Sequence, residues 1–182
     1  LSALDWFGNS LGSLGAGPVW ESEGSGRVGL TVGASRDATG GPERGAVHVL
    51  SVGRNESGDM WSWARGKLAS GSVAGLGLSD GDFFGVSVSA MGVGPGGWPV
   101  LAIGAYRDDE GGLYRGAVWL IALEGGSGPN SVSGRAVLKV ASGVGGGPGL
   151  SDEDFFGQSV VGLGQVPGSG APSHILVGAY YD

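Results

Sequence analysis

A repeated phrase constrains the fold of this chain more than any other feature. The phrase reads LSALDWFG at 1–8, LSDGDFFG at 78–85 and LSDEDFFG at 150–157. A second phrase, Gly-Ala-x-x-Asp, follows it each time, at 33–37, 104–108 and 178–182, and a third, Arg-Gly-Ala-Val, occurs at 44–47 and 115–118. Such periodicity predicts units that bury their apolar faces by stacking on neighbours.

The three repeats are predicted to span 1–76, 77–149 and 150–182, the last being partial. Glycine, at 42 of 182 residues, recurs too often for helices, and the apolar residues between glycines follow period two. The predicted strands are 9–14, 29–34, 45–50, 60–68, 86–91, 99–105, 116–123, 134–141, 158–163 and 173–179. We therefore expect an all-β fold made of four-stranded antiparallel sheets, stacked like the blades of a β-propeller, with about two and a half blades in this segment. The two aromatics before each glycine are expected to fill the space between neighbouring sheets, and the small Gly-Ala pairs to allow the backbones to approach closely there.

Composition excludes several classes of function. The net charge is −7, which argues against nucleic-acid binding because a phosphate backbone needs a basic face. The chain has no cysteine, so disulfides and thiolate metal sites are excluded. No apolar stretch approaches the roughly 20 residues that span a bilayer, so no membrane span is expected. No signal-peptide pattern opens the segment, but Leu1 lies inside a repeat phrase, so a leader could precede it.

The order of the phrases resembles the FG-GAP repeat of integrin α-subunit propellers. The matching elements are Phe-Gly at 7–8, 84–85 and 156–157, Gly-Ala at 33–34, 104–105 and 178–179, and Gly-Ala-Val at 45–47 and 116–118. The resemblance covers nearly the whole chain. It implies an extracellular or cell-surface propeller that serves adhesion or ligand binding. The family's proline after Gly-Ala is absent, since Ser35, Tyr106 and Tyr180 stand there.

The resemblance also implies a calcium loop between the first two strands of each repeat. Calcium prefers six to eight oxygen ligands, several of them carboxylates. Only the first repeat keeps carboxylates at the aligned positions, so Glu21, Glu23 and Ser25 are its candidate calcium ligands. The second and third repeats carry glycine, valine or alanine there, and we expect no cofactor in them.

The acidic turns could be metal sites or catalytic carboxylate pairs. Because Asp80/Asp82 and Asp152/Glu153/Asp154 occupy the same place in two repeats, we favour turns whose Asp side chains accept backbone N–H bonds. Asp37/Arg44 and Asp108/Arg115 share an offset across a hairpin and are predicted to be cross-strand ion pairs or, alternatively, a rim of ligand-facing arginines. Ser10 sits in a G-x-S-x-G pattern without a following helix, and we interpret it as structural.

The tryptophans offer an alternative function. Trp61 and Trp63 lie two apart on one face of a predicted strand, and with Trp98 and Trp119 they could stack on sugars or pack between sheets. Asn55-Glu56-Ser57 is an N-glycosylation sequon in a predicted turn.

The leading hypothesis is a non-enzymatic extracellular repeat protein for adhesion or structural assembly, which contacts other protein chains or further copies of itself. The alternatives are a carbohydrate-binding module that uses Trp61 and Trp63, or an accessory propeller of an enzyme whose catalytic part lies outside this segment. The absence of an asymmetric catalytic cluster favours the first.

Overall fold

The computed structural model describes residues 4–15, 26–94, 97–126, 131–164 and 174–182. Within these residues there are ten β-strands and no helix. The strands are β1 (Phe7–Gly15), β2 (Val28–Ala34), β3 (Ala46–Arg54), β4 (Met60–Ala69), β5 (Ser87–Val93), β6 (Pro99–Ala105), β7 (Ala117–Gly125), β8 (Val132–Ala141), β9 (Ser159–Gly162) and β10 (Ile175–Gly178). No described segment forms a helix that is long and apolar enough to span a bilayer.

The strands form three antiparallel sheets whose strand order follows the chain. The first sheet is β1-β2-β3-β4, the second sheet is β5-β6-β7-β8, and the third sheet pairs β9 with β10. The all-β class and all ten predicted strands are therefore confirmed. The predicted end of β3 at residue 50 was wrong, because the alternation of buried and exposed side chains continues to Arg54 and the turn begins only at Asn55.

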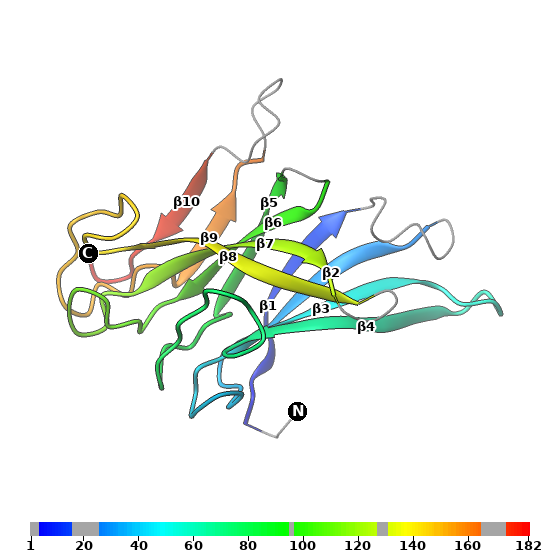
Figure 1. Cartoon of the computed structure of the whole chain (residues 1–182), viewed down its shortest axis with the longest axis horizontal. Helices are drawn as coiled ribbons and strands as arrows, with labels where there is room; N and C mark the ends of the chain where they lie inside the picture. Colours follow the sequence, from blue (N-terminus) through cyan, green and yellow to red (C-terminus); the bar gives the residue numbers. More distant parts are fainter. Residues whose placement is uncertain (1–3, 16–25, 95–96, 127–130, 165–173) are drawn as a thin grey trace.

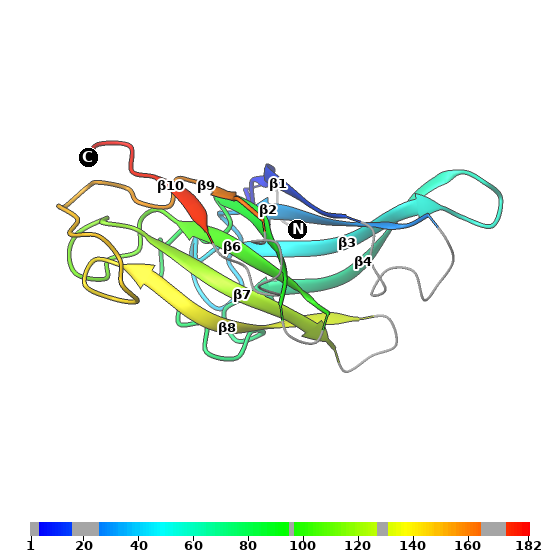
Figure 2. The same ribbon diagram turned by 90° about the horizontal axis from the view of Figure 1, so that it is seen from above.

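The sheets stack with their first strands side by side. Strand β1 lies next to β5, and β5 lies next to β9, as the two ribbon views show (Figures 1 and 2). The larger core fills the space between the first and second sheets, where Val49 and Leu68 meet Leu101 and Ile121. A smaller core, around Val118 and Phe156, lies between the second and third sheets. We call these two contacts the first junction and the second junction.

The Phe-Phe-Gly phrase crosses each junction. Phe84 is fully buried and forms a parallel bridge with Gly45, which directly precedes β3. Phe156 is buried and forms the same kind of bridge with Gly116, which directly precedes β7. The Phe84 N–H donates to the Arg44 carbonyl at 2.9 Å, and the Phe156 N–H donates to the Arg115 carbonyl at 2.9 Å. The prediction that the aromatics before each glycine fill the space between sheets is confirmed for Phe84 and Phe156. It was wrong for the first phrase, where Trp6 and Phe7 are exposed.

Glycine is required where the sheets approach most closely. A methyl group on Gly33 would overlap the Gly85 carbonyl oxygen, and one on Gly104 would overlap the Gly157 carbonyl oxygen. Beside them, the Ser87 hydroxyl donates to the Gly157 carbonyl at 2.8 Å. Sequence reasoning anticipated this close approach from the small Gly-Ala pairs, which leave room for a neighbouring backbone.

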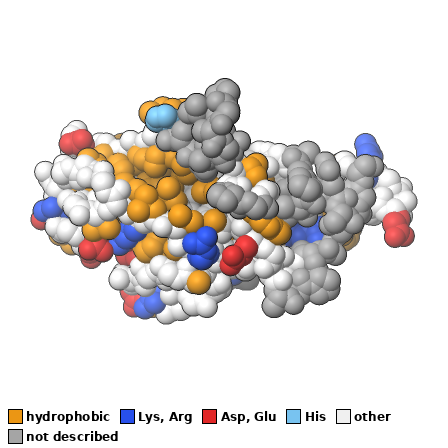
Figure 3. All heavy atoms as spheres, turned by 45° about the horizontal axis from the view of Figure 1, so that its top comes forward, with side chains coloured by type: hydrophobic (Ala, Val, Ile, Leu, Met, Phe, Trp, Pro, Cys, Tyr) orange, Lys and Arg blue, Asp and Glu red, His pale blue; other side chains and the backbone are white. Residues whose placement is uncertain are grey.

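The third sheet leaves part of the second sheet uncovered. A groove of about 320 Å³ runs from the smaller core to the surface and is lined mainly by apolar side chains, among them Met91, Trp98, Leu120 and Val137. Figure 3, which brings the top of Figure 1 forward, shows hydrophobic side chains gathered over one face of the molecule.

Candidate functional site

The acidic turns brace the backbone just before β5 and β9. The Asp82 carboxylate accepts the Ser79 N–H at 2.7 Å, and the Asp154 carboxylate accepts the Ser151 N–H at 2.6 Å. Both aspartates are buried. The interpretation of the acidic residues as turn residues is confirmed for Asp82 and Asp154, since each closes a short loop by accepting a backbone donor. Asp80 and Asp152 instead bind arginine side chains.

The predicted cross-strand ion pairs were wrong in their partners. Arg44 Nε lies 2.7 Å from Asp80, and Arg115 Nε lies 2.8 Å from Asp152, so each arginine joins its sheet to the acidic turn of the next. Asp37 instead binds Lys67 at 2.6 Å, and Asp108 binds Lys139 at 2.8 Å. The hairpin offset suggested a local partner, but sheet stacking brings a more distant carboxylate closer to each guanidinium.

The first aromatic of each repeated phrase has an unusual backbone. Trp6, Phe83 and Phe155 have φ values of 51°, 56° and 54°, in the left-handed region that bulky residues rarely adopt. This conformation separates the two neighbouring aromatics, so that Phe84 and Phe156 enter the cores. Phe83 and Phe155 instead join a row of rings at one edge of the stack. Such strained residues persist only when the surrounding structure holds them in place.

The row of rings continues across the second junction. Ring centroids are 5.5 Å apart for Phe83 and Tyr106, 5.6 Å for Tyr106 and Phe155, and 5.5 Å for Phe155 and Tyr181. Tyr180 meets Tyr181 edge to face at 4.6 Å. These spacings are those of favourable aromatic pairs. The chain thus brings together rings from four separate segments, which precede β5, follow β6, precede β9 and follow β10.

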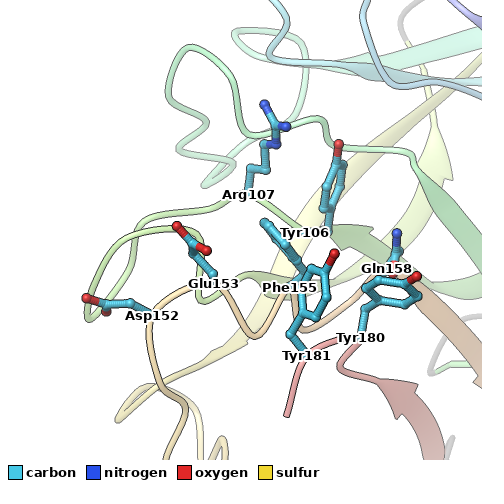
Figure 4. A pocket seen from close by; sticks show the side chains of 8 residues that line it. All are labelled: Tyr106, Arg107, Asp152, Glu153, Phe155, Gln158, Tyr180 and Tyr181. Carbon is cyan, nitrogen blue, oxygen red and sulfur yellow. The ribbon is translucent and has the colours of Figure 1, made fainter.

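A pocket opens on this row and is the candidate functional site. It has a volume of about 580 Å³, and we call it the aromatic pocket. The close view shows the rings of Tyr106, Phe155, Tyr180 and Tyr181 side by side, with the Gln158 amide near Tyr180 (Figure 4). The described residues that line it are Tyr106, Arg107, Asp152, Glu153, Phe155, Gln158, Tyr180 and Tyr181.

The charges around the aromatic pocket balance. Asp152 is paired with Arg115, so its charge is already compensated. The Arg107 guanidinium lies 5.0 Å from the Phe83 ring centroid and 5.1 Å from that of Tyr114. The Glu153 carboxylate has no hydrogen-bond or ion-pair partner within the part of the chain that the structure describes. With Asp152 paired to Arg115, the lining leaves one carboxylate, Glu153, and one guanidinium, Arg107, of opposite charge.

The equivalent place at the first junction has a different chemistry. Ser35 stands there in place of Tyr106, Gly81 in place of Glu153, Val86 in place of Gln158, and Arg107 in place of Tyr181. The residues that hold the sheets together are unchanged between the repeats, as at Asp82/Asp154, Phe84/Phe156 and Gly85/Gly157. The polar and aromatic lining is therefore not a requirement of sheet stacking. This difference between repeats was the one signal in the sequence that could have revealed the pocket.

A second, acidic pocket lies by the larger core. It has a volume of about 270 Å³ and includes Asp82, Asp108, Asp109, Glu110 and Lys139. Burial raises the pKa of Asp82 to about 6, and the nearby Asp108 carboxylate adds to this effect. Lys139 pairs with both Asp108 and Glu110, and its pKa is raised by those bonds despite its burial.

The proposed calcium ligands Glu21, Glu23 and Ser25 lie outside the described residues. Among the residues that are described, no group of three or more His, Cys, Asp or Glu side chains is arranged to hold a metal ion. His48 packs edge to face on Phe7, and burial lowers its pKa below the usual value. The Ser10 hydroxyl donates to the Gly85 carbonyl at 2.8 Å, as expected of a structural serine.

The tryptophans divide into different environments. Trp61 is 57% exposed, whereas Trp119 is buried and so packs between sheets. The Arg27 guanidinium covers the Trp63 ring at 3.9 Å, within a shallow pocket of about 370 Å³ that also includes Asn55. The Asn55 sequon lies in the β3–β4 turn, where the Asn55 side-chain oxygen accepts the Asp59 N–H at 2.9 Å.

The fold and the site define an all-β protein of stacked antiparallel sheets with an open aromatic and polar pocket. Comparison with models of known protein families gives no match, and comparison with curated protein sequences gives none.

Proposed function

We propose that this chain is a non-enzymatic extracellular repeat protein whose sheets are blades of a propeller-type domain, and that it serves adhesion or assembly by binding. The proposal rests on how the repeated polar groups are used. In each acidic turn one aspartate accepts a backbone N–H bond. The other aspartate pairs with an arginine of the preceding sheet, Arg44 or Arg115. These groups hold sheets together, which leaves them unsuited to catalysis.

The aromatic pocket supports a binding role. Small-molecule pockets are commonly about 300–1,000 Å³ and combine apolar walls with a few polar groups. The aromatic pocket has this size and composition, with a volume of about 580 Å³ and four rings beside Arg107, Glu153 and Gln158. Among the residues that the structure describes, it lies at the second junction, where the repeats differ from each other.

Two measurements test this proposal. Incubation with p-nitrophenyl esters, phosphates and glycosides should give no turnover above that of the buffer. Beads coated with the protein should adhere to extracellular-matrix surfaces or to each other, and beads coated with an unrelated acidic protein should not. Turnover that disappears on changing one residue would overturn the proposal, as would coated beads that adhere to nothing.

A second candidate function is carbohydrate binding at Trp61 and Trp63. The observation that favours it is the 57% exposure of Trp61 beside the half-buried Trp63, whose ring is partly covered by Arg27. On this hypothesis, Trp63→Ala abolishes binding to a glycan array while the circular dichroism spectrum is unchanged. Absence of binding to every glycan would exclude it.

A further inference from the structure

The aromatic pocket does not include Trp61 or Trp63, and its lining combines aromatic rings with an amide and charged side chains. Its rings come from Tyr106, Phe155, Tyr180 and Tyr181, and Tyr180 and Tyr181 are each 66% exposed. Exposed rings of this kind offer flat apolar faces, and the phenol hydroxyls at their ends both donate and accept hydrogen bonds. A ligand here must therefore combine apolar faces with many hydrogen-bonding groups.

The polar groups of the aromatic pocket restrict the class of ligand further. Gln158 offers both a donor and an acceptor, and Glu153 offers acceptors with no partner among the described residues. Arg107 Nε is buried and has no hydrogen-bond acceptor, so its guanidinium also remains under-satisfied. Hydrogen-bond donors and acceptors therefore lie side by side in the pocket. They match the adjacent hydroxyls of a sugar ring, each of which can both donate and accept.

The charge balance argues against ionic ligands. A cation would gain from Glu153 but would face the Arg107 guanidinium, and Asp152 is already paired with Arg115. An anion would face the carboxylates of Glu153 and Asp152. Because like charges at close range are costly, a neutral ligand is favoured.

We propose that the aromatic pocket binds a neutral saccharide, with one face of the sugar ring stacked on Tyr181 and its hydroxyls bonded by Glu153 and Gln158. This inference rests on the proposed binding function and names its ligand class and its residues. The repeat provides the internal comparison, because Gly81 and Val86 at the first junction remove both hydrogen-bonding side chains while sheet stacking remains.

Saturation-transfer difference NMR on the whole chain tests the proposal. The probes are methyl β-glucoside, methyl β-galactoside, methyl α-mannoside and N-acetylglucosamine, with glucuronate and glucosamine as charged comparisons. We expect transfer to the ring protons of at least one neutral probe, at least tenfold weaker affinity in Tyr181→Ala and in Gln158→Val, and weaker transfer to both charged probes. Gln158→Val introduces the residue that the first repeat carries at this place, so it should preserve the fold.

Trp61→Ala is the control for the other aromatic surface and should leave the affinity unchanged. Transfer to none of the neutral probes would overturn the saccharide proposal, as would transfer that Tyr181→Ala and Gln158→Val leave unaltered. Binding of an acetylated pentaproline peptide in place of sugars, lost in Tyr181→Ala, would assign the pocket to a proline-rich partner and also overturn it. Each of these results leaves the adhesive function intact, whereas hydrolysis of a probe glycoside would instead refute the non-enzymatic role.

Discussion

A single buried carboxyl, that of Asp82, should give this protein an unusual pH dependence. Its pKa is raised to about 6 from an ordinary value of 3.8, because the group is buried and lies near Asp108 and Asp109. The Ser79 N–H and Lys139 act in the opposite direction but do not offset burial. Between these two pKa values the folded chain retains a proton that the unfolded chain releases. The free energy of unfolding therefore falls as pH rises through this window.

We expect Asp82→Asn to remove this dependence. The asparagine oxygen can still accept the Ser79 N–H, so the turn should remain closed. The free energy of unfolding of the variant, minus that of the original chain, should therefore rise by about 2–3 kcal/mol from pH 4 to pH 7. This follows from about 1.4 kcal/mol for each pKa unit. Urea unfolding at each pH measures the difference.

His48 acts in the opposite sense, because its lowered pKa makes folding less favourable as pH falls below 6.5. Its contribution is common to both proteins and cancels in the difference between them. A difference between variant and original that is constant from pH 4 to pH 7 would contradict the assignment to Asp82.

At the scale of the strand, the Ser87 hydroxyl, which joins two sheets, can be compared with the hydroxyl of Ser159 at the same place in the next repeat. Ser87 donates to the Gly157 carbonyl across the second junction at 2.8 Å and is buried. Ser159 occupies the same place in β9, is exposed, and makes no hydrogen bond through its hydroxyl within the described residues. Ser87→Ala should cost about 1–2 kcal/mol, because a buried acceptor loses its donor.

Ser159→Ala is the matched control and should change stability by less than about 0.5 kcal/mol. Thermal unfolding followed by circular dichroism compares the two variants. Equal melting temperatures for Ser87→Ala and Ser159→Ala would show that the hydroxyl bond does not contribute to the junction.

The strands were predictable from the sequence, but the contacts between sheets were only partly so. Alternating apolar residues and glycine turns are local features, and they predicted every strand and the four-stranded unit. The Arg44–Asp80 pair spans 36 residues and depends on how one sheet lies on the next. A hairpin offset, which suggested Asp37 as the partner, contains no information about that stacking.

The aromatic pocket was harder to foresee for the same reason. Tyr106, Phe155 and Tyr181 belong to three segments that meet only at the second junction. The left-handed backbone of Phe155, at φ 54°, directs its ring toward this edge, and no residue type in the phrase signals that conformation. The positions that the repeats share predict how the sheets stack, whereas the pocket is formed by positions at which the repeats differ.

For the molecule as a whole, the first junction should contribute more to the stability of the chain than the second junction. A repeat array is stabilised by each unit and by its contacts with nearest neighbours. The first junction joins two four-stranded sheets over the larger core, which contains the fully buried Phe84. The second junction joins the second sheet to only two strands over the smaller core, which contains Phe156.

Phe84→Ala should destabilise the entire chain by about 3–5 kcal/mol, the usual cost of truncating a buried phenylalanine. Hydrogen exchange measured by mass spectrometry should show faster exchange in both β1–β4 and β5–β8, because each sheet relies on the same core. Phe156→Ala should instead accelerate exchange in β9 and β10 first, since these two short strands can open while the larger core stays closed. Loss of protection confined to one sheet in Phe84→Ala would contradict this account, because it would mean that the first and second sheets fold independently of their shared core.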